Sequence, residues 1–311
     1  MHDDIQAQMV TLLRALAPQE GYNLTALEQV RILRSDRPLA RTPVLYDPGI
    51  VIVCQGSKHG YLGSQIYCYD EQHYLAVSVP VPFVMETVAS AERPLLALYM
   101  HLDFAVAAEL MLQLEQQGGA QPLPAPQSMM SSPMDAVMKT SVLRFLQALH
   151  DPRDAVILGP ALMRELYYRV LTGAQGSVLR AALSQQGQFG KISKALRHIH
   201  ASYAQPLQLA QLAAEAGMSV PTFHSHFKTI TGVAPMQYVK SVRLHQARML
   251  MVRQTLTAAA ASFAVGYESP SQFNREFKRL FGLPPAEESR RMQQHFAVPP
   301  EQPDAIFISS H

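Results

Sequence analysis

The sequence predicts an α+β protein of two domains: a strand-rich N-terminal domain with flanking helices, and an all-helical C-terminal domain. Three observations lead to this prediction. The 311 residues are too many for one typical domain and suit two. Short runs rich in Val, Ile, Tyr and Leu fill residues 43–101. From Lys191 onwards the pattern is helical. We therefore expect domains at 1–186 and 187–293, followed by a flexible tail over 294–311.

The N-terminal domain is expected to hold an antiparallel sheet or small barrel. The strings IVIVC, YLGSQIYCY, HYLAVSVPV and LLALYMHL are separated by turn-forming residues at the spacing of short paired strands. Around them the expected elements are an amphipathic helix at 3–17, a helix from Asp103, a Gly/Pro/Ser-rich loop at 118–133, helices within 134–149 and 160–185, and a short linker from Gly187 to Gly190.

Composition excludes several classes of protein. Hydrophobic residues make up 48% of the chain, which rules out wholesale disorder. The apolar stretches are too short for a helix that spans a membrane. The N-terminus carries Asp3 and Asp4 and does not read as a signal peptide, so we expect a cytoplasmic protein with no membrane partner. Cys54 and Cys68 are too few for a disulfide scaffold or a cysteine zinc site.

The net charge of +2 hides a strong asymmetry. Residues 191–291 hold 13 Lys and Arg against 5 Asp and Glu, a net charge of +8. Residues 1–190 hold 13 basic and 17 acidic residues, a net charge of −4. A confined basic segment favours a polyanionic partner such as nucleic acid, although an ordinary solvated helical surface is the alternative.

The basic segment contains an internal repeat with an offset of 50 residues. SVPTFHSHFKTITGVAP begins at Ser219 and SPSQFNREFKRLFGLPP begins at Ser269, and each follows an Ala-rich stretch that ends in Gly. Each half reads as a helix, a tight turn with Gly, and a second helix that a Ser caps. A pair of Phe residues four positions apart buries one face of each second helix and leaves the other face exposed. Two helix–turn–helix units in register on a basic segment favour DNA binding over an ordinary helical bundle.

A long helix is expected between the two units, over Met236–Val252. At ~1.5 Å per residue it spans ~25 Å. That length is of the right order to hold two recognition helices about one DNA turn, ~34 Å, apart.

The C-terminal strings resemble the AraC/XylS family of bacterial transcription regulators over residues 192–291. The strings LAQLAAEAGMSVPTFHSHFKTITGVAPMQYVKSVRLHQARMLM and FAVGYESPSQFNREFKRLFGLPP carry the resemblance. It implies a DNA-binding domain of seven helices that activates or represses transcription at a promoter. The sequence departs from many members at AEESRR, where an aromatic-Arg pair is usual, so we expect the last helix to pack differently.

The N-terminal half is similar to the effector domain of one AraC subgroup. PVLYDPGIVIVCQGSKHGYLG, YDEQHYLAVSVPVP and ASAERPLLAL support this over most of residues 20–180. The resemblance implies a cupin-like β-barrel followed by helices. It implies double-stranded promoter DNA and RNA polymerase as partners, a small-molecule effector, and a homodimer.

We expect direct DNA contacts from the exposed face of each recognition helix. Arg can pair with guanine and Asn or Gln with adenine, so the second helix should supply more base readout. The candidates are Pro221, Thr222, His224, Ser225 and Lys228 in the first unit, and Ser271, Gln272, Asn274, Arg275 and Lys278 in the second.

Other chemistry has weaker support. The alternative function is a cupin-like enzyme, but His59, His73 and His101 are scattered and no nucleophile or phosphate-loop motif is present, so we expect no enzyme activity, metal or cofactor. Cys54 and Cys68 lie on strands that we expect to be neighbours, and they are either inert thiols or a sensor pair. An effector cavity lined by apolar side chains is expected in the barrel, with Gln55, Lys58 and Tyr61 as its polar groups. A barrel filled by its own side chains, which serves only in dimerisation, is the alternative.

Overall fold

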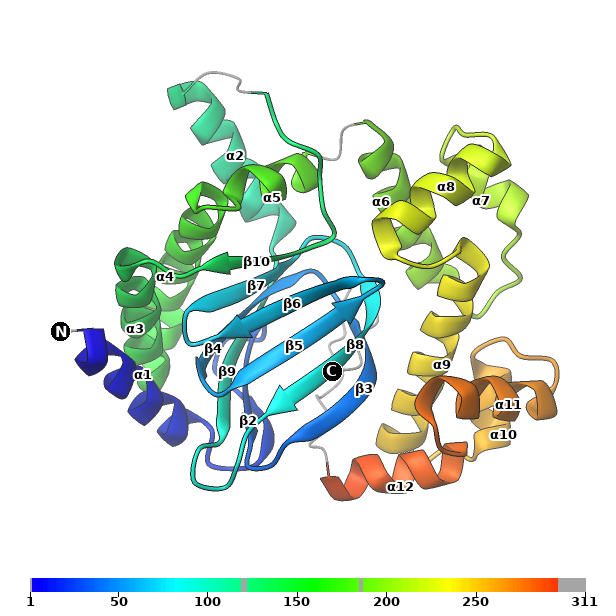
Figure 1. Cartoon of the computed structure of the whole chain (residues 1–311), viewed down its shortest axis with the longest axis horizontal. Helices are drawn as coiled ribbons and strands as arrows, with labels where there is room; N and C mark the ends of the chain where they lie inside the picture. The colour runs from blue at the N-terminus through cyan, green and yellow to red at the C-terminus, as the bar shows by residue number, and fades with distance from the viewer. Residues whose placement is uncertain (1, 119–121, 185–186, 296–311) are drawn as a thin grey trace.

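A computed structural model describes residues 2–118, 122–184 and 187–295 of the chain. A curled sheet with helices on one side forms the N-terminal half, and a purely helical half lies against the edge of this sheet (Figure 1). No helix in the described ranges has the length and apolar character needed to cross a membrane.

The sheet has ten strands, and their pairings are antiparallel. Nine of the strands follow the order β1-β2-β9-β4-β7-β6-β5-β8-β3, and β10 pairs with β7. The sheet curls so that β5, β6 and β8 lie in front of β4 and β9 in Figure 1. The strands are β1 (Gly21–Leu24), β2 (Val30–Ser35), β3 (Leu39–Tyr46), β4 (Gly49–Gln55), β5 (Ser57–Leu62), β6 (Gln65–Asp70), β7 (His73–Val77), β8 (Val81–Val88), β9 (Leu95–His101) and β10 (Met129–Pro133).

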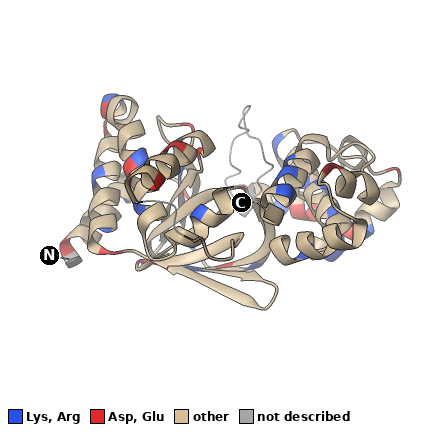
Figure 2. Cartoon of the chain, turned by 90° about the horizontal axis from the view of Figure 1, so that it is seen from above, with Lys and Arg blue, Asp and Glu red and all other residues tan. Residues whose placement is uncertain are grey.

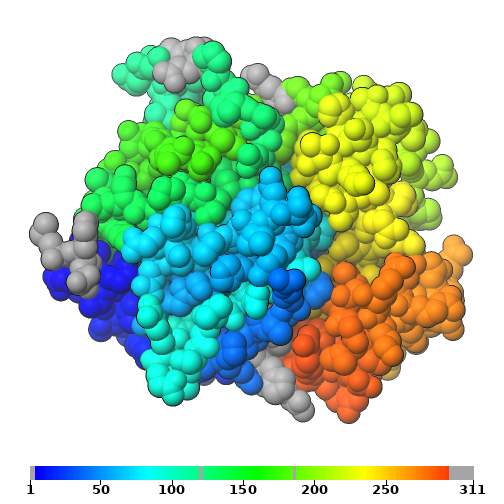
Figure 3. All heavy atoms as spheres, viewed as in Figure 1, coloured from blue at the N-terminus to red at the C-terminus, as the bar shows by residue number. Residues whose placement is uncertain are grey.

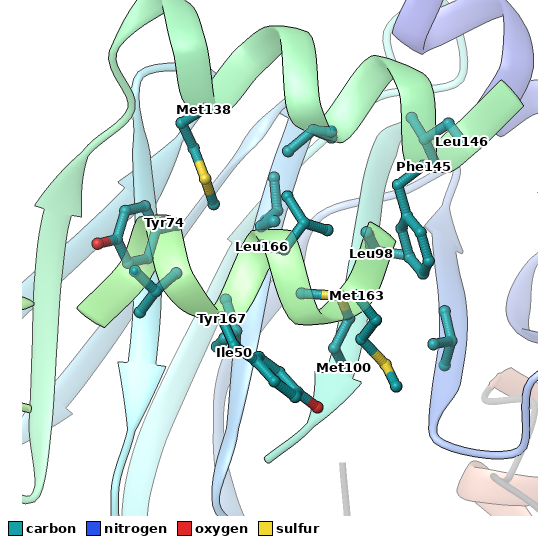
Figure 4. Close-up of a cluster of buried hydrophobic side chains, with 14 of the residues drawn as sticks. Ile50, Tyr74, Leu98, Met100, Met138, Phe145, Leu146, Met163, Leu166 and Tyr167 are labelled. Atoms are coloured by element: carbon teal, nitrogen blue, oxygen red, sulfur yellow. The ribbon is translucent and has the colours of Figure 1, made fainter. Parts of the chain in front are cut away.

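Helices cover the outer face of the sheet and form the first hydrophobic core. They are α1 (His2–Leu16), α2 (Phe104–Gly118), α3 (Ala136–His150), α4 (Pro152–Thr172) and α5 (Gly176–Leu183). Phe145 and Leu166 on α3 and α4 point toward Leu98 and Met100 on β9 (Figure 4). Because side chains alternate along a strand, this face takes every second residue of β4, β7 and β9.

The inner face of the sheet is equally apolar, and its core continues into the helical half. Val51, Val53, Phe83 and Tyr99 belong to one buried cluster with residues of the first helix–turn–helix unit. The helices of this half are α6 (Gly187–Ser202), α7 (Leu209–Glu215), α8 (Val220–Thr231), α9 (Pro235–Arg253), α10 (Ala258–Ala264), α11 (Pro270–Phe281) and α12 (Pro285–His295). The two halves therefore share one core instead of meeting through a polar linker.

Several sequence-based expectations are wrong in detail. Residues 129–133, expected within a loop, form β10, because β6 pairs with β7 only at His73 and leaves most of that side of β7 for them to pair with. The expected linker from Gly187 is the first turn of α6. Strands β1 and β2 lie before residue 43, where no strand was expected. The tail lies largely outside the described residues.

We predict that Leu166→Ala lowers the free energy of unfolding by about 2–5 kcal/mol, because the side chain is fully buried between α4 and the sheet. Leu112→Ala on α2, where the side chain is 56% exposed, is the control and should change it by less than about 0.5 kcal/mol. Urea unfolding followed by circular dichroism measures both. Equal effects of the two substitutions would contradict the packing described here.

Candidate nucleic-acid interface

The first helix–turn–helix unit consists of α7 and α8. Ser219 begins α8, and its hydroxyl oxygen accepts a hydrogen bond from the Thr222 amide at 3.4 Å. Phe223 and Phe227 are fully buried with ring centroids 5.5 Å apart. Gly232 ends the helix with φ +78°, a left-handed conformation that glycine adopts without strain.

The second unit repeats this construction in α10 and α11. Ser269 caps α11 through the Gln272 amide at 3.3 Å, and Gly282 ends it with φ +81°. Phe273 and Phe277 are fully buried with centroids 5.4 Å apart. The agreement of cap, aromatic pair and terminal glycine confirms the predicted repeat. The polar N-terminal face of each helix is consequently left outside the core.

Helix α9 joins the two units, as expected, and one of its arginines ties them together. The Arg243 guanidinium donates to the backbone carbonyl oxygens of Tyr203 at 2.7 Å, Gln205 at 2.8 Å and Gly266 at 3.1 Å. Gly266 lies in the turn of the second unit, whereas Tyr203 and Gln205 follow α6. Three hydrogen bonds from a rigid planar group fix the turn of the second unit to α9 and to the segment that leads into the first unit.

The residues expected to contact DNA occupy the free faces of α8 and α11. All ten are exposed: Pro221, Thr222, His224, Ser225, Lys228, Ser271, Gln272, Asn274, Arg275 and Lys278. The exposed face of α8 has no Lys or Arg in its first two turns, whereas the exposed face of α11 carries Arg275. Asn274 and Arg275 make no hydrogen bond or ion pair with the described residues, so their side chains are available to a ligand.

Gln272 is less free than the sequence suggested. Its amide nitrogen donates to a Glu276 oxygen at 3.2 Å, and the same carboxylate accepts from Lys240 at 2.7 Å and from the Tyr267 hydroxyl at 2.8 Å. Hydrogen bonds from these groups lower the Glu276 pKa against the opposing effect of burial. The spacing of four residues between Gln272 and Glu276 is a signal that sequence reasoning missed. It also missed Arg279, which is exposed in the last turn of α11.

Basic side chains predominate over the helical half. Lys and Arg are spread along its helices, with fewer Asp and Glu, in Figure 2. Lys191 and Lys194 are exposed one turn apart on α6, so the positive surface extends beyond the two recognition helices. A positive surface around exposed helix N-termini attracts the phosphates of a nucleic acid.

The helical half is anchored to the sheet through α9. Tyr238 is fully buried; its hydroxyl donates to the Pro80 carbonyl oxygen at 3.0 Å and accepts from His200 Nε2 at 2.7 Å. Burial lowers the His200 pKa to about 3, so this imidazole is neutral at physiological pH. In the space-filling view the surface of the sheet meets that of the helical half along this boundary (Figure 3).

The three residues expected to orient an effector do not come together. Gln55 donates to the Pro94 carbonyl oxygen at 2.8 Å. Tyr61 donates to Glu86 at 2.7 Å and lies under the Arg41 guanidinium at 4.2 Å. Lys58 is 1% exposed and lies three positions from Tyr61 on the same strand. Because alternate residues of a strand face opposite sides, Lys58 and Tyr61 cannot line one cavity.

The histidine and cysteine candidates are also dispersed. His59, His73 and His101 lie on three different strands, and no group of three or more potential metal ligands occurs within the described residues. The expectation that the cysteines lie on neighbouring strands is wrong, because β7 separates β4 from β6. Cys54 is buried, which raises its thiol pKa to about 12, and burial together with Asp70 raises that of Cys68. Neither thiol is therefore activated.

Comparison with known proteins agrees with this geometry. The family model of the AraC-type transcriptional regulator N-terminus matches residues 26–178, and that of a helix-turn-helix domain matches residues 212–300. The chain belongs to the AraC family of transcriptional regulators. Its AraC-type N-terminal half is the curled sheet with its helices, and its helix-turn-helix match covers α8 to α12.

Individual relatives cover parts of this AraC-family chain. The virulence regulon transcriptional activator VirF of Yersinia enterocolitica is 24% identical over 131 residues, 42% of this chain and 48% of VirF. The RCS-specific transcriptional activator RclR of Escherichia coli is 35% identical over 83 residues, 27% of this chain and 29% of RclR. The chain thus spans about half, or less, of the length of these curated relatives. Neither they nor the family models support the alternative of an enzyme.

Solved structures share the overall fold. An apo form of a ToxT variant from Vibrio cholerae strain SCE256 superposes with a TM-score of 0.57 at 11% identity, covering 88% of this chain and 99% of ToxT. Wild-type ToxT of the same strain with bound unsaturated fatty acid gives a TM-score of 0.55 at 11% identity, covering 87% and 97%. The arrangement of a sheet domain followed by two helix–turn–helix units is therefore a known one.

We predict that Gly266→Ala destabilises the helical half more than Gly282→Ala. Both glycines have positive φ, +84° and +81°, so alanine costs about 1–2 kcal/mol of backbone strain at either position. At Gly266 the new Cβ would also clash with the Ala204 carbonyl oxygen, whereas at Gly282 nothing lies within 4 Å. Thermal melts of the two variants measure the difference, and equal melting temperatures would contradict the close approach at Gly266.

Proposed function

We propose that the protein is a sequence-specific DNA-binding transcription regulator of the AraC type. Residues 187–293 bind double-stranded promoter DNA, and residues 1–186 receive a small-molecule effector and form the dimerisation surface. The observation that carries this proposal is the pair of exposed recognition faces on α8 and α11, two units that α9 joins and that Arg243 links through hydrogen bonds to Tyr203 and Gly266. Activation is the favoured sign of regulation, because VirF and RclR are both named as transcriptional activators.

The two recognition helices divide the work. Arg275, with Asn274 beside it, reads base edges, because both side chains are exposed and uncommitted. The face of α8, with Thr222, His224 and Ser225, carries no Lys or Arg in its first two turns. It contacts the sugar-phosphate backbone of the DNA and responds to the shape of the groove. Lys228 and Lys278, in the last turns of the two helices, bind phosphates and set the salt dependence of binding.

An effector in the N-terminal half can act on DNA binding through the shared core. The hydrogen bond from Tyr238 to Pro80 links α9 directly to the segment between β7 and β8. A ligand that binds two arrangements of this contact with different affinity shifts the population of the DNA-competent one. The ToxT structure with bound unsaturated fatty acid gives a precedent for an effector in a protein of this fold. Contact with RNA polymerase completes the function of an activator.

We predict that Arg275→Ala weakens binding to a guanine-containing target by about 1–3 kcal/mol, roughly 5- to 150-fold in Kd, and relaxes the preference at that base pair. Genomic fragments that the full chain selects supply the target, and fluorescence anisotropy measures the affinity at several salt concentrations.

Arg144→Ala is the matched control for Arg275→Ala. It removes the same charge from an exposed arginine on α3, in the N-terminal half. We expect it to leave DNA affinity within about twofold of the wild type, since screening weakens a distant exposed charge. If Arg275→Ala weakened binding to all sequences equally, Arg275 would be a phosphate contact. If the full chain folds but shows no salt-sensitive DNA binding, the proposed function itself is refuted.

A further inference from the structure

Glu276 lies at the centre of a hydrogen-bond network on the side of α11 that faces α9. Its carboxylate accepts from the Lys240 ammonium at 2.7 Å, from the Tyr267 hydroxyl at 2.8 Å and from the Gln272 side-chain nitrogen at 3.2 Å. The Glu276 side chain is 13% exposed, and the Tyr267 ring lies 5.4 Å from that of the buried Phe273. The network is therefore anchored in the core of the second unit.

The chemistry of the partners fixes the direction of these hydrogen bonds. The Lys240 ammonium has donors only, and an ionised carboxylate has acceptors only. Burial alone raises the Glu276 pKa, but the hydrogen bonds from its three partners lower it below the usual value, so the carboxylate is ionised at neutral pH. Burial also raises the Tyr267 pKa, so this hydroxyl keeps the proton that it donates. Any further side chain in the network must therefore offer Glu276 a donor.

This requirement orients the Gln272 amide. A glutamine amide has a donor end and an acceptor end, and either end can face a partner that both donates and accepts. Beside a carboxylate the nitrogen must face inward, as it does toward Glu276. The Gln272 oxygen lies on the other side of the amide and accepts no hydrogen bond from the described residues. Gln272 thus presents an acceptor on the exposed face of α11.

Gln272 lies where a recognition helix meets base edges. It belongs to the first turn of α11, and the N-terminal residues of such a helix contact bases in the major groove. Arg275 follows three positions later and is also exposed. The rise between them, ~4.5 Å along the helix, is close to one base-pair step of ~3.4 Å. Gln272 therefore faces a base pair next to the one that Arg275 reads.

The first unit has no counterpart of this network. At the offset of 50 residues, Thr222 and His226 occupy the positions of Gln272 and Glu276. The Thr222 hydroxyl lies 2.8 Å from the Ser219 hydroxyl in the cap of α8. Because the residue that corresponds to Glu276 is not a carboxylate, an amide orientation of this kind is a property of the second unit. It agrees with the larger share of base readout proposed for α11.

We infer that Glu276 is a positioning residue for base recognition, and that Gln272 selects a base with an exocyclic amino group, adenine or cytosine, beside the guanine of Arg275. The inference rests on the proposed function, because it names a base that α11 reads. Adenine and cytosine carry an amino donor in the major groove, whereas guanine and thymine present acceptors and no donor there. A free glutamine could turn its nitrogen toward guanine or thymine, and Glu276 prevents this turn.

Selection from a duplex library tests the inference on the full chain. The base pairs on each side of the guanine, which the comparison with Arg275→Ala identifies, are randomised, and the bound duplexes are sequenced. At one neighbouring pair we expect the wild type to prefer adenine or cytosine over guanine or thymine by about 3- to 10-fold, the contribution of one hydrogen bond. Gln272→Met, which has a similar length but no amide, should abolish this preference.

Glu276→Gln tests the orientation itself, because it places an amide where the carboxylate was. Lys240 can only donate, so it holds the oxygen of the new amide and leaves the new nitrogen to face Gln272. Gln272 must then turn its oxygen inward and its nitrogen toward the DNA. We expect the preference to fall by about threefold or more and to shift toward guanine or thymine. In a chain that also carries Gln272→Met, Glu276→Gln should leave base preference unchanged.

Glu287→Gln is the matched control, since it removes the same charge from an exposed glutamate in the first turn of α12. It should change the overall attraction to DNA and leave the base preference within about 1.5-fold of the wild type. Thermal melts establish that each variant is folded. No preference for adenine or cytosine, a preference that survives Gln272→Met, or an unchanged preference in folded Glu276→Gln would each overturn the inference. The first two outcomes decide the matter even if Glu276→Gln does not fold.

The same selection separates this inference from the proposed function. Salt-sensitive binding with a guanine preference that depends on Arg275, but without the neighbouring preference, would refute the role of Gln272 and Glu276 alone. The proposed function would then stand. A folded full chain that selects no duplex would refute both.

Discussion

The buried guanidinium of Arg248 fixes the second helix–turn–helix unit relative to the sheet. It lies on α9 with 1% exposure, 3.4 Å from the carboxylate of Glu288 on α12. The same group donates to the Pro43 carbonyl oxygen of β3 and lies 4.3 Å from the ring centroid of Phe281 on α11. Burial lowers its pKa only to about 10, so it stays charged at neutral pH. A buried charge tolerates little displacement of its partners, because each lost contact leaves it uncompensated.

The partners of Arg248 are adapted to that charge. His245 is fully buried, and burial together with Arg248 lowers its pKa well below the usual value. The imidazole is therefore neutral and its Nδ1 can accept from the guanidinium at 3.4 Å. Glu288 is fully buried and also pairs with Arg291 at 2.8 Å, so its two oxygens face two cations. The AEESRR segment, which departs from many AraC-family sequences, supplies both of these α12 residues.

The sequence allowed the helical half to be predicted well, because its signals are local. Ser caps, Phe pairs at a spacing of four and terminal glycines recur within 17 residues in each unit. The sheet was harder to predict, because its pairings are long-range. Strand β10 has the sequence MMSSP and becomes a strand only by pairing with β7, more than 50 residues earlier. Likewise β2 pairs with β9 at a separation of 60 residues or more.

The candidate site shows the same contrast. Exposure of the ten expected DNA contacts follows from the helical period, which the sequence displays. The odd spacing of Lys58 and Tyr61 on one strand already places them on opposite faces, but which of the two faces the interior depends on the register of β5, because a shift of one residue would exchange them. The engagement of Gln272 by Glu276 follows helical spacing, but the role of Lys240 in the same network required the fold.

The contacts from α9 to the sheet have a consequence for divergence among related regulators. The side chains of Tyr238 and Arg248 both donate hydrogen bonds to main-chain carbonyl oxygens, those of Pro80 and Pro43 respectively. A carbonyl oxygen is present whatever side chain its residue carries. The lining of the effector half can therefore change residue by residue, and with it the ligand that is recognised, while the mechanical connection to the DNA-binding half stays the same. New effector specificities can therefore arise in this fold without a matching change in the DNA-binding half.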